Sequence, residues 1–329
     1  MASPTLTDDT RAISAQRTSR GTGLRARSRR PGLAPLGLLP FLGYVALVFL
    51  APVGFIVYDA FRRTVTLNST ERDPVTQQFV HKTQTSFTTA NVSASLRGVY
   101  WRSLVTSVEL SAVVAVLGAV LGLLLAWAVV NTRRAGLSRL VSSAAAVTAN
   151  FGGIPLAFLF IATLDANSGV LTTFLKHRFG FSLTDDAHIH LANTSGLAIV
   201  YLYFLIPLMV LVITPSLEGL KPQWAEAAEN LGASRIRYWR HVAGPVLVPS
   251  FLGSVLLLFC SSFSAFATAY AINSSYPLVT IRIDAVLSGN VLSGQENLGA
   301  ALALDMIVVV VPLTVAYQLL QRRTSRWLS

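Results

Sequence analysis

The stretch QWAEAAENLGASRIRYWRHVAGP, residues 223–245, is a charged segment in a chain that is otherwise strongly apolar. It lies between two long apolar runs, at about 196–216 and about 246–272. About 20 mostly apolar residues are enough to cross a bilayer as a helix. The stretch is therefore predicted to be a polar loop between two membrane spans. The sequence as a whole predicts an all-α polytopic membrane protein.

The composition supports a membrane protein. Of the 329 residues, 53% are hydrophobic and only 12% are charged, and the mean hydropathy is +0.57. Soluble domains carry about a quarter charged residues. The net charge of +11 would suggest nucleic-acid binding in a soluble protein. Here the basic residues lie mostly beside apolar runs, so we expect a lipid bilayer and no nucleic acid as partner. The single cysteine, Cys260, excludes a disulfide within the chain.

Six apolar runs are long enough to be spans. The third is the weakest, because NFGGIP at 150–155 interrupts it. The runs lie at 36–60, 103–130, about 140–164, about 196–216, about 246–272 and about 298–320. The membrane domain is therefore predicted to cover 36–320. The polar, arginine-rich segment 1–35 is predicted to be a disordered basic tail.

Orientation follows from the lysines and arginines, which favour the cytoplasmic side. With both termini in the cytoplasm, the cytoplasmic segments carry 17 of the 26 basic residues and the outer segments carry nine. The cytoplasmic segments would be 1–35, 131–139, 217–245 and the basic C-terminus 321–329. The Thr- and Ser-rich segment 61–102 would be a long outer loop.

The loop 217–245 has the sequence pattern of two short helices. Pro222 suits a first helical turn, and Trp224, Ala228 and Leu231 recur on one face. Gly232 can take the left-handed conformation that ends a helix, and Ser234 can cap the next one.

In the second predicted helix Ile236, Trp239 and Val242 recur at i, i+3 and i+6, with arginines around them. Gly244 and Pro245 are expected to end this helix before the fifth span. The residues alone leave two interpretations open. The loop is either an interfacial helix pair lying on the inner leaflet or a docking surface for a cytoplasmic partner.

A resemblance favours the docking surface. Glu226-Ala227-Ala228, three residues, Gly232, nine residues, then Val242 and Pro245 resembles the EAA loop of ATP-binding-cassette importer permeases. Val242 stands where that pattern has isoleucine, and Gly244 departs from its leucine. The resemblance extends over about 36–320 and is greatest to the spermidine/putrescine, iron and phosphonate branch.

The resemblance implies the six-helix type I importer permease fold and a function without catalysis. Glu226 would sit in a cleft of an ATPase subunit and Gly232 would form the turn, with Ala227, Ala228, Val242 and Pro245 completing the coupling loop. The implied partners are an ATPase dimer, a second permease chain (a copy or a different chain) and an extracytoplasmic solute-binding protein. The implied location is the bacterial inner membrane, and the implied substrate is a small charged solute such as a polyamine, a ferric ion or a phosphonate.

The sequence agrees that ATP is hydrolysed elsewhere. A phosphate-binding Walker loop requires a lysine after a glycine, and none of the three lysines follows one. We therefore expect no cofactor and no metal in this chain, with ATP and Mg²⁺ on the partner. DDAHIH at 185–190 is expected to be a solvated outer loop rather than a metal site.

Four polar residues in the spans are candidates for the substrate pathway: Glu109, Asn150, Ser262 and Ser264. Helix–helix hydrogen bonds, a simple kink or plain helix packing are the alternatives for them. For the whole chain, the alternative function is a secondary transporter or channel whose amphipathic loop lies on the lipid. A membrane-bound enzyme lacks any recognisable motif.

Overall fold

The computed structural model describes residues 34–72, 79–132, 135–166, 168–180, 190–191, 193–288 and 297–325. Residues 1–33 of the predicted tail 1–35 lie outside these ranges. Residues 185–189 of the DDAHIH stretch also lie outside them. The chain forms two compact units, Met1–Val53 and Gly54–Ser329. Among the residues described, five helices are long and apolar enough to cross a membrane, and a bent helix pair makes a sixth candidate span.

The first candidate span, Leu39–Ala60, contains a π-helical turn. α2 (Ala34–Val45) leads into the π-helix η1 (Ala46–Leu50), and α3 (Ala51–Ala60) continues it. The N–H of Ala51 donates to the carbonyl of Ala46, five residues back. Pro52 follows at once and has no N–H to donate, and its ring would collide with an ordinary α-helical carbonyl. The wider π-helical turn lets the helix continue past Pro52.

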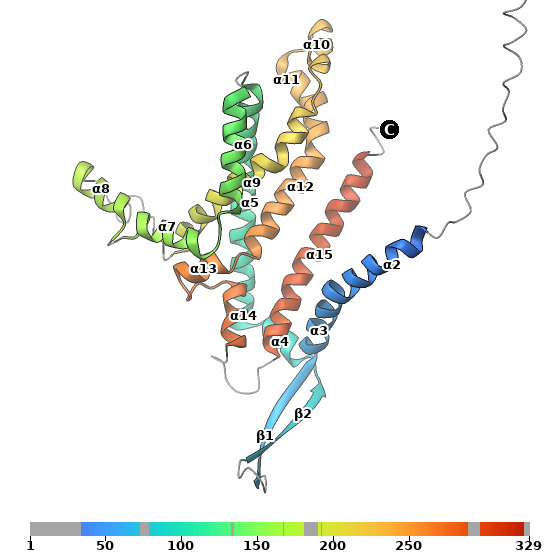
Figure 1. Cartoon of the computed structure of the whole chain (residues 1–329), viewed down its shortest axis with the longest axis vertical. Coiled ribbons are helices and arrows are strands. Elements are labelled where there is room, and N and C mark those ends of the chain that lie inside the picture. The colour runs from blue at the N-terminus through green and yellow to red at the C-terminus, as the bar shows by residue number, and fades with distance from the viewer. Residues whose placement is uncertain are drawn as a thin grey trace, which may run out of the picture. The chain divides into compact units, whose positions relative to one another are not determined.

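Four further spans build the second unit: α5 (Gly98–Asn131), α9 (Thr194–Glu218), α12 (Gly244–Phe263) and α15 (Leu298–Ser325). Figure 1 shows α5, α9 and α12 side by side, with the short helices α10 and α11 at one end and α4 and α14 at the other. Many large apolar side chains lie on their exposed faces, which is the property of membrane-spanning helices. The predictions for spans two, four and six are confirmed to within five residues.

The core lies where α5 packs against α9, along a stripe of small residues on α5. Gly118 and Gly122 are four residues apart on this stripe. A Cβ atom at Gly122 would lie 2.5 Å from the Cβ of Met209. Small residues at this spacing let two helix backbones approach closely in a membrane. The glycine pair therefore sets the distance between α5 and α9.

The third predicted span is broken, as its NFGGIP sequence indicated. α6 (Ala135–Asn150) and α7 (Ile154–Leu164) meet at a bend of 102°. Gly153 has φ 74° and ψ −148°, a conformation that essentially only glycine adopts. α8 (Val170–Phe179) follows α7. The predicted interruption of this span is confirmed.

The fifth span differs from the predicted 246–272. α12 ends at Phe263, and a separate short helix, α13 (Ala267–Ile272), packs on α7. The hydroxyl and the N–H of Ser264 both donate to the carbonyl of Cys260 at the helix end. The residues after Phe263 are apolar enough for a span, but they turn back to hold the break in the third span.

The segment 61–102 contains regular structure that the sequence reasoning missed. β1 (Arg62–Arg72) and β2 (Phe79–Phe87) form an antiparallel hairpin, and α4 (Ala90–Ser95) follows. Asn91 anchors the base of the hairpin, because its side-chain amide donates to the carbonyl of Arg62 at 2.7 Å. α14 (Val279–Leu287) lies at the same end of the unit (Figure 1).

Candidate functional site

The first helix of the predicted coupling loop is α10 (Pro222–Asn230), with Pro222 in its first turn. Gly232 has φ 74° and ends the helix in a Schellman motif. The N–H of Ala233 donates to the carbonyl of Ala228 at 2.9 Å, and the N–H of Gly232 donates to that of Glu229 at 2.8 Å. The predicted helix start at Pro222 and the predicted left-handed helix end at Gly232 are confirmed.

The second helix begins as predicted and does not end as predicted. The hydroxyl of Ser234 accepts from the N–H of Arg237 at 3.4 Å, which caps α11 (Arg235–Tyr238). α11 then continues through the π-helix η2 (Trp239–Ala243) into α12, so one helix runs from Arg235 to Phe263. The expectation that Gly244 and Pro245 stop the helix is wrong, because the π-turn accommodates the proline as η1 does before Pro52.

The π-turn also explains the residue that departs from the coupling-loop pattern. The N–H of Gly244 donates to the carbonyl of Trp239, five residues back. A Cβ atom at Gly244 would lie 2.6 Å from that carbonyl oxygen. A leucine in this position would not fit the turn, and glycine does.

The apolar residues of the loop divide into an outward and an inward set. Leu231 is 87% exposed and Ile236 is 80% exposed, and Trp224 lies on the outward side too. Glu226 and Ala227 are exposed beside them, Ala228 and Val242 are half-buried and Pro245 is exposed. An exposed apolar patch with a polar rim is typical of a protein interaction site.

The inward set connects the loop to the spans. Trp239 packs against the core of the second unit, and Ala243 is fully buried. Trp239 also borders a wholly apolar cavity of about 270 Å³ between α5, α9 and η2. α11 is thus joined to α12 by a continuous helix, and Trp239 shares this cavity with residues of α5 and α9.

The four candidate pathway residues make their hydrogen bonds separately. Asn150 is exposed and its amide donates to the carbonyl of Ala146 at 2.8 Å. Ser262 is buried and donates to Leu258 at 2.9 Å, and Ser264 caps its own helix. Glu109 is exposed on the face of α5 opposite the core. Among the described residues no hydrogen bond joins any two of the four.

Ser262 lies instead in a polar crevice of the core. Ser107, Ser111, Tyr201 and Thr280 line the same crevice, which is too narrow for a water molecule. The hydroxyl of Ser107 accepts from the N–H of Val279 at 2.9 Å, and the hydroxyl of Tyr201 donates to the carbonyl of Ala265 at 2.9 Å. These hydrogen bonds connect α5 with α14 and α9 with the segment after α12, and the crevice is closed in this structure.

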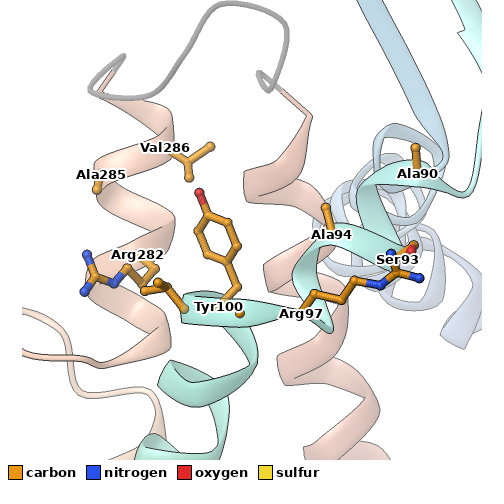
Figure 2. A pocket seen from close by; sticks show the side chains of 10 residues that line it. Ala90, Ser93, Ala94, Arg97, Tyr100, Arg282, Ala285 and Val286 are labelled. Carbon is orange, nitrogen blue, oxygen red and sulfur yellow. The ribbon is translucent and has the colours of Figure 1, made fainter.

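An open cavity of about 840 Å³ lies at the end of the unit opposite the coupling loop. Figure 2 shows Tyr100 pointing toward Val286, with Arg97 extending toward Ser93 on one side and Arg282 on the other. The remaining lining residues are small or apolar: Ala90, Ala94, Gly98, Val99 and Ala285. The sequence reasoning counted both arginines only as charges of outer segments. They line one cavity because the fold brings α4, the start of α5 and α14 together.

Within the described ranges, no group of three or more His, Cys, Asp or Glu side chains could hold a metal ion. The fold, the exposed loop and the broken span together define a multi-pass membrane permease.

The chain belongs to the family of binding-protein-dependent transport system inner membrane components, whose model matches residues 101–326. A permease of this family is a transport subunit rather than an enzyme. The predicted permease class and its type I fold are confirmed.

Two curated relatives and one solved structure illustrate the similarity. The ferric transport system permease protein FbpB of Actinobacillus pleuropneumoniae is 25% identical over 65% of this chain and 31% of its own length. The sulfate transport system permease protein CysT of Salmonella typhimurium is 31% identical over 47% of this chain and 52% of its own length. The chain thus spans about a third to half of the length of these relatives.

The solved structure shows the fold. A chain of a bacterial ABC transporter involved in the import of the acidic polysaccharide alginate superimposes with a TM-score of 0.64. The match covers 88% of this chain and 95% of that chain, with 15% sequence identity.

Proposed function

We propose that this chain is the permease subunit of an ATP-driven solute importer and is coupled to separate ATPase subunits through α10 and α11. The observation that carries the proposal is the exposure of the apolar side chains Leu231 and Ile236 on a loop that also exposes Trp224 and Glu226. Leu231 and Ile236 are 87% and 80% exposed, so they add little to the packing of the described part of the chain. An apolar patch of this kind is stable in water when a partner covers it.

The geometry supports a mechanical role for this patch. α11 continues without interruption into α12, so a partner that moves α10 and α11 also moves a membrane span. A nucleotide-driven ATPase dimer supplies such a movement by favouring one of two arrangements of the spans. ATP and Mg²⁺ would then be bound by the partner subunits.

The other parts of the proposal follow from the same assignment. The coupling loop lies on the cytoplasmic side, and both termini lie there with it. A second permease chain completes the transport path, and an extracytoplasmic binding protein delivers solute to the α4–α14 end. Glu109, with its exposed carboxylate on α5, then faces the second chain or the path rather than lipid, because ionisable groups in membranes seldom face hydrocarbon.

Co-purification with the ATPase tests the coupling loop. Wild type, Glu226→Arg and the control Glu229→Arg, the same charge change one turn further on, are compared for retained ATPase and for nucleotide-driven uptake. We expect Glu226→Arg to weaken retention roughly tenfold or more and Glu229→Arg to weaken it less. Leu231→Asp should also release the ATPase while the permease keeps its thermal stability, since the Leu231 side chain is 87% exposed.

A different result would favour the alternative function. If no variant, including wild type, retains an ATPase while the folded protein moves solute down a gradient, the chain is a secondary transporter or channel. The loop would then lie on the inner leaflet.

A further inference from the structure

The cavity at the α4–α14 end is positively charged. Arg97 and Arg282 line it, and none of its ten lining residues is acidic. The first turn of α5 opens into it through Gly98, Val99 and Tyr100. N–H groups in a first helical turn have no acceptor within the helix and carry partial positive charge. In the part of the chain that the structure describes, neither arginine forms an ion pair with a carboxylate.

Arg282 is held in place by a relay of hydrogen bonds from α5. Its Nε donates to the hydroxyl of Ser103 at 3.4 Å, and that hydroxyl donates to the carbonyl of Val99 at 2.9 Å. One turn further along α5, the hydroxyl of Ser107 accepts from the N–H of Val279 at 2.9 Å. Both serines are buried. These contacts fix the start of α14 on α5 and leave the two Nη groups of Arg282 for a ligand.

The size and the lining of the cavity indicate which kind of anion it can bind. Figure 2 shows the two arginines extending on opposite sides of Tyr100. The cavity of about 840 Å³ is many times the roughly 30 Å³ that a water molecule occupies in the liquid. Between the charges the wall consists mostly of alanine, glycine and valine. Such a site fits a ligand with acidic groups on an uncharged body.

We propose that this cavity binds an organic anion, a solute bearing carboxylate or phosphonate groups, at the entrance to the transport path. The importer then accepts anionic solutes and rejects polyamines and free ferric ions, which the arginines repel. The direction of transport rests on the proposed function. Binding of the anion to the cavity does not.

Cysteine labelling measures the charge preference of the cavity. Cys260→Ala removes the native thiol, and Ala285→Cys places a thiol in the cavity wall. Ser86→Cys, on the exposed face of β2, is the control. The permease–ATPase complex, in phosphatidylcholine nanodiscs, is labelled with an anionic and with a cationic methanethiosulfonate reagent. We expect the anionic-to-cationic rate ratio at residue 285 to exceed that at residue 86 by roughly tenfold, because a cleft lined by one sign of charge concentrates the opposite sign.

Protection by solutes identifies the ligand class. Succinate and ethylphosphonate at millimolar concentration should slow labelling at residue 285 at least about fivefold, and spermidine at equal ionic strength should not. Arg97→Gln with Arg282→Gln should abolish both the rate preference and the protection. The matched pair Arg97→Lys and Arg282→Lys should keep the rate preference, and unchanged labelling of Ser86→Cys in each background reports that the protein is folded.

Several results would overturn the proposal. They are equal rate ratios at the two positions, protection by spermidine, or protection by neither anion. Slower labelling only when anionic lipid is added would assign the cavity to a lipid headgroup, and protection by a solute-free binding protein alone would assign it to an acidic protein segment. None of these results depends on ATPase retention. Loss of the anion site and loss of coupling through Glu226 are therefore separate outcomes.

Discussion

The hydroxyl of Thr268 makes two hydrogen bonds with the backbone of Gly153, 115 residues earlier in the chain. Its Oγ1 accepts from the N–H of Gly153 at 2.9 Å and donates to the carbonyl of the same residue at 3.2 Å. Gly153 is the residue at which the third span bends. One side chain from α13 therefore pairs the N–H of Gly153 at the break and shares the Gly153 carbonyl with the N–H of Ala157.

Thr268→Val should destabilise the protein with almost no change in side-chain volume. Thr268 is buried, so the substitution leaves the Gly153 N–H without its partner, which costs about 1–3 kcal/mol of unfolding free energy. Denaturation in mixed micelles measures the loss. The control Thr214→Val removes a bond that the hydroxyl makes to its own helix, to Val210, and should cost less. Equal losses for the two variants would show that the contact with Gly153 has no special weight.

The spacing of α5 and α9 gives a second prediction. A methyl group at residue 122 would lie 2.9 Å from the carbonyl oxygen of Ile206 as well as against Met209, so Gly122→Ala has to separate the two helices. We expect a loss of about 1–3 kcal/mol in unfolding free energy. Gly43→Ala, where the added methyl meets nothing within 4 Å, should be neutral or slightly stabilising. A neutral Gly122→Ala would contradict close packing at this position.

The features predicted correctly from the sequence depend on short stretches of the chain. A run of apolar residues is enough to indicate a span, and Gly232 and Ser234 act on backbone groups within three to five residues of themselves. The NFGGIP interruption is local in the same way. These residues determine their surroundings without information from the rest of the fold.

The features that were missed depend on contacts between distant segments or on a choice between two local outcomes. Gly244-Pro245 is compatible with a helix stop and with a π-turn, and the sequence alone does not separate them. Arg97 and Arg282 line one cavity only because Ser103 and Ser107 hold α14 on α5. Polar and apolar side chains alternate over Thr64, Val65, Thr66 and Leu67, which did carry a signal for the hairpin, since this alternation favours a strand.

The π-turn before α12 gives a third prediction, which rests on the proposed coupling role. A methyl group at residue 244 would collide with the Trp239 carbonyl, so Gly244→Ala should displace α10 and α11 relative to α12. The exposed patch itself is unchanged, so ATPase retention should persist. Nucleotide-driven uptake should fall roughly two- to thirtyfold.

Gly219→Ala is the matched control for this variant. Gly219 ends α9, and a methyl there would lie 3.4 Å from the nearest carbonyl oxygen, an ordinary contact. Uptake should therefore be close to wild type. If Gly244→Ala transports as well as Gly219→Ala, the continuity from η2 to α12 is not needed for coupling.

Tyr276 gives a prediction for pH dependence. It lies between α13 and α14, outside the candidate spans, and its hydroxyl donates to the carbonyl of Leu191. Burial raises the pKa of Tyr276 above its ordinary value of 10.0, because the ionised form is poorly solvated there. The folded protein thus keeps this proton to a higher pH than the unfolded chain. The stabilisation is complete below about pH 10 and is lost as the pH rises above it.

Tyr276→Phe should lower the free energy of unfolding by about 1 kcal/mol at pH 8, through the lost hydrogen bond. The difference between wild type and this variant should shrink from pH 9 to pH 11, because only wild type loses stability by ionising this hydroxyl. Chemical denaturation at each pH measures the difference, with Tyr270→Phe as the control at an exposed tyrosine. A difference that grows as the pH rises would mean that the folded state favours the ionised hydroxyl, against the burial and the hydrogen bond to Leu191.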